Sequence, residues 1–167
     1  RFTGPPGVRA LRCELPDGID EAALSGASAV VHCAYATRET DLARARSVNE
    51  EGTRRLLEAS RRAGVPRMIF VSTVAASEGA PNYYARSKHA MEAVFDPVRD
   101  AIVRPGLIIG KGGHGLFQQL VDNLTGIGVV PLFGGGRQPL QTVHVDDVCE
   151  AIARIVERNL AGAFNVA

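Results

Sequence analysis

Residues 29–72 read AVVHCAYATRETDLARARSVNEEGTRRLLEASRRAGVPRMIFVS and contain one complete strand–helix–strand pattern. Two short apolar runs, Ala29–Cys33 and Met68–Ser72, are typical of strands that are buried on both faces of a parallel sheet. Between them, Thr40-Asp41 offers an N-cap to a helix that ends at Gly64-Val65-Pro66. A crossover helix of this length joins parallel strands, so the pattern predicts an α/β fold.

The same alternation continues on both sides of this stretch. The expected strands cover residues 8–15, 101–103, 129–132, 142–145 and 163–166, and the expected helices cover 40–63, 84–98, 116–124 and 146–158. We predict a Rossmann-type doubly wound parallel sheet with helices on both faces, which lacks its first strand–helix unit. Residues 1–110 form a partial dinucleotide-binding region in this prediction. Residues 111–167 belong to the same structural domain and add part of a small C-terminal substrate region and the last elements of the sheet.

Composition narrows the class of protein. The 167 residues are 46% hydrophobic and 22% charged, which suits one soluble domain, and no apolar run approaches the length of about 20 residues that a membrane helix needs. Nineteen basic and eighteen acidic residues create no one-sided field for nucleic acid or for a membrane surface. The three cysteines form no Cys-x-x-Cys pair, which argues against a zinc site or a disulfide framework. We therefore expect a cytoplasmic protein with a small-molecule substrate and no metal.

The segment Tyr84-Ala85-Arg86-Ser87-Lys88 places a phenol and an ammonium four residues apart, on one face of the expected helix. An ammonium there favours tyrosinate, so Lys88 is predicted to lower the pKa of Tyr84 and let it exchange a proton with a substrate hydroxyl or carbonyl. Ser72-Thr73 ends the preceding strand, where ligands bind in such sheets. A Tyr-x-x-x-Lys pair often arises by chance on a solvated helix, but the two hydroxyls just upstream favour a site.

These motifs resemble the short-chain dehydrogenase/reductase superfamily, in its extended or atypical branch of epimerase/dehydratase-like proteins. The matching stretches span about residues 8–167 and stand in the order of that family. They are Ala29–Ala34, Asn49–Thr53 with Leu56-Leu57, Phe70–Thr73, Tyr84–Lys88, Arg104–Gly106 and Val143–Val148. The resemblance implies an NAD(P)-dependent oxidoreductase or epimerase-like enzyme that moves a hydride between a substrate carbon and the nicotinamide.

The resemblance also implies roles for single residues. Tyr84 resembles the general acid/base, and Thr73 the hydroxyl that positions the substrate oxygen, with Ser72 as the fallback. Lys88 resembles the residue that lowers the pKa of the tyrosine and bonds the nicotinamide ribose. The implied catalytic set is therefore Thr73, Tyr84 and Lys88.

A wider set of residues is implied to line the cofactor, which is NAD or NADP. Glu14-Leu15 stands where relatives hold the adenine, and Asn49 where they support the active-site end of the cleft. Pro105 falls where the backbone meets the nicotinamide carboxamide. The full implied set is Glu14, Leu15, Ala34, Tyr35, Asn49, Ser72, Tyr84, Lys88 and Pro105.

Two departures from the family pattern matter. The glycine-rich turn that cradles pyrophosphate is absent ahead of Val8, so we expect the polypeptide to extend N-terminally by a strand–helix–strand unit and to continue past residue 167. Arg1 would then stand where an arginine faces the 2′-phosphate of NADP. Leu140 stands where nucleotide-sugar enzymes carry a phosphate-binding arginine, although Arg137 lies nearby. This difference favours a smaller or less charged carbonyl or hydroxyl substrate.

Several alternatives stay open at this point. The sequence does not separate an epimerase from a reductase or a dehydratase. The same scaffold also serves a non-catalytic NAD(P)-binding sensor or assembly protein, or a fragment without activity of its own. The helices over 40–63 and 84–98 are a possible homodimer contact in the resembling family. We further expect His32 to be a hydrogen-bonded core histidine and Asp146 to cap the helix that follows it.

Overall fold

The computed structural model describes residues 5–111, 116–129, 133–137 and 140–167. Its main sheet has four parallel strands in the order β1-β2-β3-β6. These strands are β1 (Val30–His32), β2 (Met68–Val71), β3 (Ala101–Pro105) and β6 (Gly162–Val166). Because β6 comes from the C-terminal region and pairs directly with β3, that region completes the same sheet.

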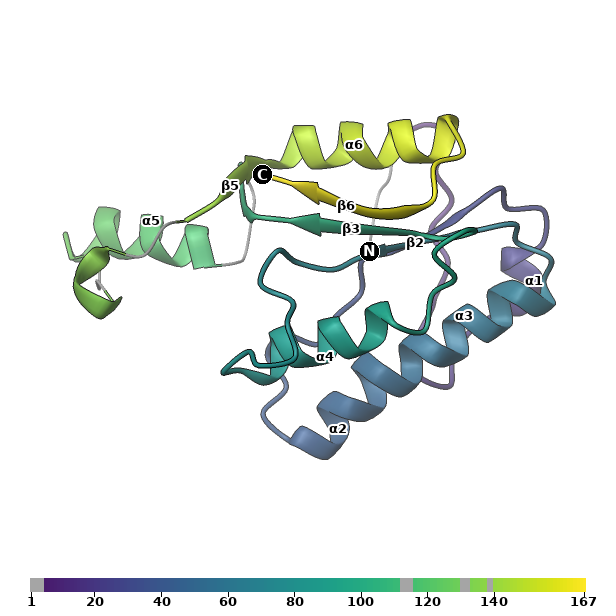
Figure 1. Cartoon of the computed structure of the whole chain (residues 1–167), viewed down its shortest axis with the longest axis horizontal. Coiled ribbons are helices and arrows are strands. Elements are labelled where there is room, and N and C mark those ends of the chain that lie inside the picture. Colours follow the sequence, from purple (N-terminus) through teal and green to yellow (C-terminus); the bar gives the residue numbers. More distant parts are fainter. Residues whose placement is uncertain (1–4, 112–115, 130–132, 138–139) are drawn as a thin grey trace.

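Helices cover both faces of this sheet, as predicted (Figure 1). One face carries α1 (Glu21–Leu24), α2 (Leu42–Arg46), α3 (Gly52–Arg62) and α4 (Tyr83–Glu92). The other face carries α6 (Val145–Glu157). A π-helical turn, η1 (Ser47–Glu51), joins α2 to α3, so the expected helix over 40–63 is one continuous rod with an irregular centre. The Rossmann-type arrangement is therefore confirmed.

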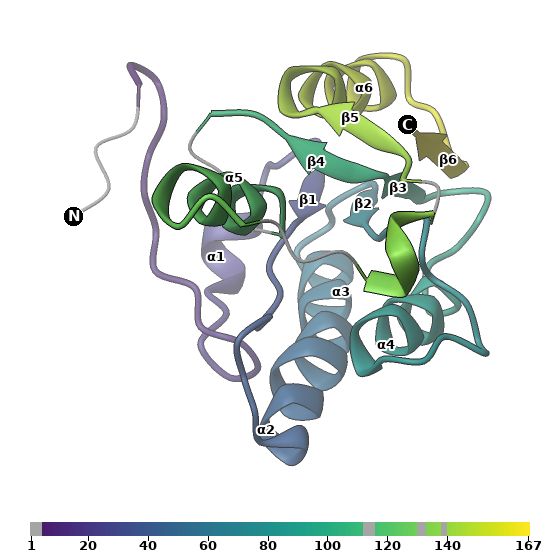
Figure 2. The same ribbon diagram turned by 90° about the vertical axis from the view of Figure 1, so that its left-hand side faces the viewer.

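A smaller unit extends from the carboxyl end of β3. It contains a two-stranded parallel sheet of β4 (Leu107–Ile109) and β5 (Thr142–His144), the helix α5 (Leu116–Gly126) and a 3₁₀ turn, η2 (Phe133–Gly136). The helix α5 stands apart from both helix layers (Figures 1 and 2). Strand β4 escaped prediction because it is only three residues long and lies between Gly106 and Gly110. The strand expected over 129–132 lies mostly outside the described residues.

Alternation along the strands divides the core into two clusters, because successive side chains of a strand point to opposite faces of the sheet. The cluster beneath α3 and α4 consists of Leu56, Met68, Phe70, Met91 and Phe95. The cluster beneath α6 consists of Ile69, Ala101, Val103 and Ile155. Burial on both faces explains why β2 is an unbroken apolar run.

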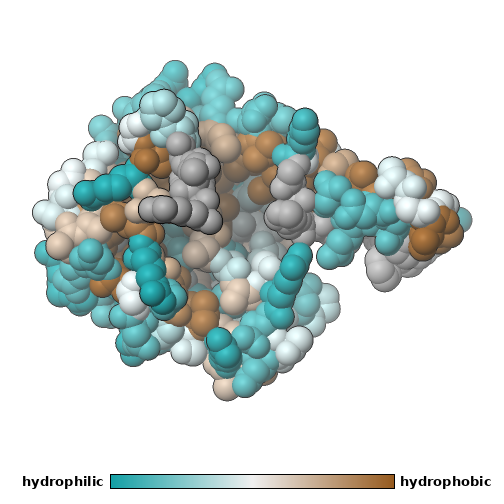
Figure 3. Space-filling model, turned by 180° about the vertical axis from the view of Figure 1, so that it is seen from behind, coloured by the Kyte–Doolittle hydropathy of each residue, from teal (hydrophilic) through white to brown (hydrophobic). Residues whose placement is uncertain are grey.

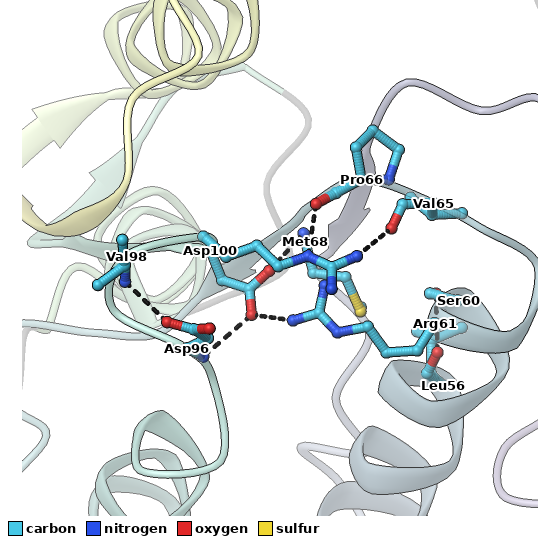
Figure 4. Close-up of polar contacts among 10 residues, drawn as sticks. Leu56, Ser60, Arg61, Val65, Pro66, Met68, Asp96, Val98 and Asp100 are labelled. Atoms are coloured by element: carbon cyan, nitrogen blue, oxygen red, sulfur yellow. Dashed lines mark hydrogen bonds and ion pairs between the residues drawn. The ribbon is translucent and has the colours of Figure 1, made fainter.

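A buried carboxylate fastens the amino ends of the strands (Figure 4). Asp100 is fully buried, and its side chain accepts hydrogen bonds from the backbone N–H groups of Met68 (2.9 Å) and Asp96 (3.0 Å). Its second oxygen also forms an ion pair with Arg61 of α3. Beside it, Arg99 donates to two backbone carbonyls of the loop that enters β2. The amino ends of β2 and β3 are thus connected to α3, and the carboxyl ends of the strands take no part in this network.

The predicted strand over Val8–Leu15 is wrong. Within residues 5–29 the only β structure is an isolated bridge between Glu14 and Gly18, and Val8 and Leu11 are about half exposed. An alternating segment becomes a strand only when a neighbour takes its backbone hydrogen bonds, and among the described residues β1 pairs with β2 alone. On the β1 side the molecule is hollowed, with hydrophobic side chains around the hollow (Figure 3).

Two helix boundaries also differ from the prediction. Helix α4 ends at Glu92 rather than near residue 98, because Pro97 has no N–H for the carbonyl of Ala93 and its ring would clash with that carbonyl in a continued helix. The N-cap of α6 is His144, whose Nδ1 accepts from the backbone N–H of Asp146 at 3.3 Å. Asp146 lies in the first turn instead, where the helix dipole favours a negative charge.

Candidate active site

The carboxyl ends of β1 and β2 and the first turns of α4 bring four predicted residues together. Tyr35 follows β1, Thr73 follows β2, and Tyr84 and Lys88 lie one turn apart on α4. Asn82 begins this helix, since its Oδ1 accepts from the N–H of Ala85 at 2.9 Å. The cap fixes where the helix starts and hence which of its side chains face the strand ends.

Lys88 is buried, with only 3% of its surface exposed. Its ammonium donates to the carbonyl of Val71 (2.7 Å) and lies 4.8 Å from the ring centroid of Tyr35 and 4.6 Å from that of Phe70. Burial lowers the pKa of Lys88 to about 8, although nearby Cys33 and Glu92 raise it. The amine is therefore charged at neutral pH but close to its titration.

Tyr84 keeps 38% of its surface exposed, so a ligand can reach it. Its ring meets that of Tyr35 edge-on, with centroids 5.0 Å apart and planes at 84°. Burial raises the pKa of Tyr84, and a hydrogen bond with the Thr73 side chain lowers it in part. The predicted lowering by Lys88 is wrong, because that ammonium is held by the Val71 carbonyl and by two aromatic rings rather than by the phenol.

The two hydroxyls that follow β2 have different partners. Ser72 is buried, and its hydroxyl donates to Oε1 of Glu92 at 2.5 Å. Arg104 holds the same carboxylate through two hydrogen bonds of 2.9 and 2.5 Å. Thr73 is only partly buried and interacts with Tyr84. This geometry favours Thr73 over Ser72 as the group that meets a substrate oxygen.

Glu92 and Arg104 are site residues that the sequence analysis missed. Glu92 follows Lys88 by four residues, so it lies on the same helical face and links α4 to β3 through Arg104. The four-residue spacing was the sequence signal for Glu92. It does not reveal that this carboxylate is buried, at 7% exposure, beside a strand end.

Asn49 lies buried in the π-helical turn. Its Oδ1 accepts from the backbone N–H of Ala36 at 2.7 Å and thereby holds the loop that follows β1. Its Nδ2 is buried and has no hydrogen-bond partner within the described part of the chain. A buried donor without a partner is costly, so this end of the site retains capacity for an acceptor group.

His32 is a core residue, as predicted. The Thr53 hydroxyl donates to the carbonyl of Asn49 (2.6 Å), so His32 Nε2, 2.9 Å from that hydroxyl, is the donor of the next bond. Burial lowers the pKa of His32 to about 4, and Lys88 adds a smaller effect in the same direction. The neutral ring fastens β1 to the turn that carries Asn49.

The remaining predicted residues are spread more widely. Ala34 is exposed directly after β1, and Pro105 is buried at the end of β3, where its carbonyl accepts from the loop after β2 at 3.0 Å. Glu14 is exposed and pairs with Arg12 (2.7 Å), while Leu15 packs against the core cluster beneath α3 and α4. Neither residue is joined to the tyrosine–lysine pair by a hydrogen bond or ion pair of the described chain. Arg1 lies outside the described residues.

The order of these motifs matches a known family. The model of the NAD dependent epimerase/dehydratase family matches residues 11–167. The chain belongs to this family. The resemblance to epimerase/dehydratase-like proteins is therefore confirmed. Among the described residues of this family member, no helix has the length and apolar character needed to cross a membrane.

Two curated relatives are, by their names, an enzyme and a subunit of a larger complex. The chain is 40% identical over 111 residues to a ceramide reductase of Caulobacter vibrioides, covering 62% of this chain and 33% of that protein. It is 37% identical over 100 residues to NADH dehydrogenase [ubiquinone] 1 alpha subcomplex subunit 9, mitochondrial, of Arabidopsis thaliana, covering 58% of this chain and 24% of that protein. This family member thus spans about a third or less of the length of these relatives.

Solved structures give longer matches. A crystal structure of a DesIV double mutant (dTDP-glucose 4,6-dehydratase) from Streptomyces venezuelae, with NAD and DAU bound, superposes with a TM-score of 0.69 at 29% identity. The match covers 87% of this epimerase/dehydratase-family chain and 53% of the other. The described strands and helices therefore correspond to about half of that enzyme.

Proposed function

We propose that this protein is an NAD(P)-dependent oxidoreductase or epimerase-like enzyme that acts on a carbonyl or hydroxyl carbon. The observation that carries the proposal is the group formed by the accessible Tyr84 phenol, the Thr73 hydroxyl and the buried Lys88 ammonium at the strand ends. Ligands of parallel α/β sheets bind at this end. A proton donor, an oxygen-binding hydroxyl and a cation are the groups that hydride transfer to a carbonyl requires from the protein.

The donor set at the strand ends fits the nicotinamide–ribose half of NAD or NADP. The ammonium of Lys88 and the phenol of Tyr84 suit ribose and substrate oxygens, and the unpartnered Nδ2 of Asn49 offers a further buried donor. Ala34 and Pro105 would line the same end of the cleft. When bound, the nicotinamide supplies a ring carbon that gives or accepts a hydride.

The protein's own residues handle the proton. Because burial keeps the pKa of Tyr84 above its ordinary value, the phenol is protonated at neutral pH and suited to donate to a carbonyl oxygen held by Thr73. The hydrogen bond with the Thr73 side chain, which lowers the pKa of Tyr84 in part, stabilises the tyrosinate that remains until a solvent proton restores the phenol. In the opposite direction the same oxygen takes the proton of a substrate hydroxyl.

We propose a substrate that is smaller or less charged than a nucleotide-diphosphate sugar. Leu140 is 64% exposed and has no charge to offer a diphosphate, and the ceramide reductase of Caulobacter vibrioides, by its name, acts on a ceramide. DesIV is a dTDP-glucose dehydratase, so dTDP-glucose is the appropriate counter-test. Saturable binding of dTDP-glucose would overturn this choice of substrate.

A second function, a non-catalytic subunit or sensor on the same scaffold, is supported by the similarity to the Arabidopsis subunit of NADH dehydrogenase. Such a protein has no need for an accessible proton donor beside a buried cation.

Whichever of the two functions holds, the proposed homodimer contact is the surface formed by the helices α2, α3 and α4. Sedimentation would measure the oligomeric state.

The first experiment is a fluorescence titration of the full chain with NADH and with NADPH. Saturable binding of either cofactor is expected. Tyr84→Phe should leave the Kd within about twofold, because it keeps the ring, whereas Lys88→Met should weaken binding by about tenfold through loss of a charged hydrogen bond. Failure of the wild-type chain to bind either cofactor would refute the proposed function, and equal binding by all three proteins would refute the role of Lys88.

A further inference from the structure

Tyr35 contacts three residues of α4 with three different parts of its side chain. Its hydroxyl lies 2.6 Å from Oγ of Ser87, its ring lies edge-on against Tyr84, and the Lys88 ammonium stands 4.8 Å from its ring centroid. Tyr84 and Lys88 are the proposed proton-transfer pair. One side chain from the end of β1 therefore touches both members of the pair and Ser87, which precedes Lys88.

The hydrogen bonds fix the orientation of this ring. The Ser87 hydroxyl donates to the carbonyl of Tyr84 at 3.2 Å, so it accepts from the Tyr35 phenol. The phenol is thereby anchored to the backbone of α4 through one intervening hydroxyl. Ser87 is buried at 3% exposure, which protects this connection from competition by water.

The same ring closes one side of the Lys88 environment. Phe70 contributes a second ring, whose centroid lies 4.6 Å from the ammonium. The Val71 carbonyl accepts a hydrogen bond of 2.7 Å from the same ammonium. Aromatic faces attract a cation and also exclude water from it. Removing the Tyr35 ring would open the ammonium to solvent and remove one of its two aromatic contacts.

We propose that Tyr35 is a positioning residue that holds the Tyr84 phenol and the Lys88 ammonium in place for proton transfer. This inference rests on the proposed function, because proton transfer is the reason for which Tyr84 and Lys88 need to be held in place. It differs from the role that the family resemblance implies for Tyr35, which is to line the cofactor. The three contacts with α4 engage the ring and the hydroxyl of Tyr35 before any ligand is considered.

The test follows the Lys88 side chain by NMR in the full chain labelled with ¹³C,¹⁵N-lysine. The sequence has two lysines, so Lys111 provides an internal reference in the same spectra. The titratable groups near Lys88 are Tyr35, Tyr84, His32, Cys33 and Glu92, and none of them is altered except Tyr35.

In the wild type, the Lys88 signals should titrate with a midpoint of about 8 and carry ring-current shifts. Tyr35→Leu should raise the midpoint toward that of an ordinary lysine, because the ammonium regains water, and should reduce the ring-current shift. Tyr35→Phe keeps the ring and loses only the anchoring hydroxyl, and Ser87→Ala removes the same bond from the other side. These two variants should agree with each other and fall between the wild type and Tyr35→Leu.

A folded Tyr35→Leu protein with wild-type Lys88 signals would overturn the inference. Should that variant not fold, the hydroxyl variants decide, and unchanged Lys88 midpoints in both Tyr35→Phe and Ser87→Ala would overturn it as well. Cofactor titration of the wild type separates the two proposals. If no NADH or NADPH binds, the proposed function fails, while the Lys88 spectra still report whether Tyr35 positions this amine.

Discussion

At the scale of single residues, the sequence predicted the candidate site residues but not their partners. Thr73, Tyr84 and Lys88 all lie at the carboxyl ends of the strands, because the strand–helix pattern places both Thr73 and the first turns of α4 there. That the Lys88 ammonium would donate to the Val71 carbonyl and lie against Tyr35 depends on tertiary packing. Helical spacing alone suggested the Tyr84 phenol as its partner, and this choice gave the wrong sign for the tyrosine pKa.

The buried amine should make Lys88→Met more stable than the wild type at pH 7. The pKa of Lys88 is lowered from 10.5 to about 8, so folding is opposed while the amine is charged. By linkage, wild-type stability rises with pH between about 8 and 10.5, where the unfolded chain holds more protons. We expect a gain of about 1–3 kcal/mol in the free energy of unfolding, from urea denaturation at pH 7.

The gain should shrink as the pH is raised through this window, because the folded wild type then loses its buried charge. Lys111→Met is the matched control, since Lys111 is exposed, and it should leave stability within about 0.5 kcal/mol. A Lys88→Met protein that is less stable than the wild type at pH 7 would show that the contacts of the ammonium outweigh its desolvation.

At the scale of elements, the segment Asn49–Thr53 shows how a sequence motif becomes architecture. Asn49 holds the loop after β1, Thr53 bonds His32 of β1, and Gly52 lets Leu15 approach the helix. The motif was visible in the sequence, whereas the π-helical turn that presents it was not. A π turn depends on which backbone carbonyl each N–H selects, and side-chain periodicity carries no information on that choice.

Gly52→Ala should destabilise the protein by about 1–3 kcal/mol, because overpacking forces a shift of neighbouring atoms. A Cβ at this position would lie 2.8 Å from the Cβ of Leu15, which is closer than two carbons can pack. Urea denaturation measures the loss, and adding Leu15→Gly, which removes that Cβ, should cost less in the Gly52→Ala protein than in the wild type. Gly79→Ala is the control, since no atom lies within 4 Å of the added Cβ, and it should change stability by less than about 1 kcal/mol. Equal effects at Gly52 and Gly79 would contradict the close packing of Leu15 on α3.

At the scale of the whole molecule, the fold class was predictable and the extent of the sheet was not. Apolar runs separated by amphipathic helices specify parallel strands wherever both neighbours lie within the chain, as for β2 and β3. The segment over Val8–Leu15 has the alternation of a strand, but strand formation is a property of a pair. Val8 and Leu11 of this segment remain exposed, and β1 forms the edge on the hollowed side (Figure 3).

The buried ion pair that stabilises the fold lies at the amino ends of the strands, and the candidate site lies at their carboxyl ends. Asp100→Ala should therefore lower stability without changing the site. Asp100 joins β2, the turn before β3 and α3 at the amino ends (Figure 4). Tyr84 and Lys88 lie at the carboxyl ends. Removing this buried carboxylate leaves Arg61 without its charged partner and should cost about 3–5 kcal/mol in unfolding free energy. In the fraction that remains folded, the NMR midpoint of Lys88 should stay at about 8, since none of its contacts is touched. If Asp100→Ala does not fold, Asp100→Asn provides a milder break of the same ion pair, because an amide keeps an oxygen that accepts from a backbone N–H. A shifted Lys88 midpoint in either variant, with the fold intact, would show instead that the amino-end network transmits strain through the strands to the site.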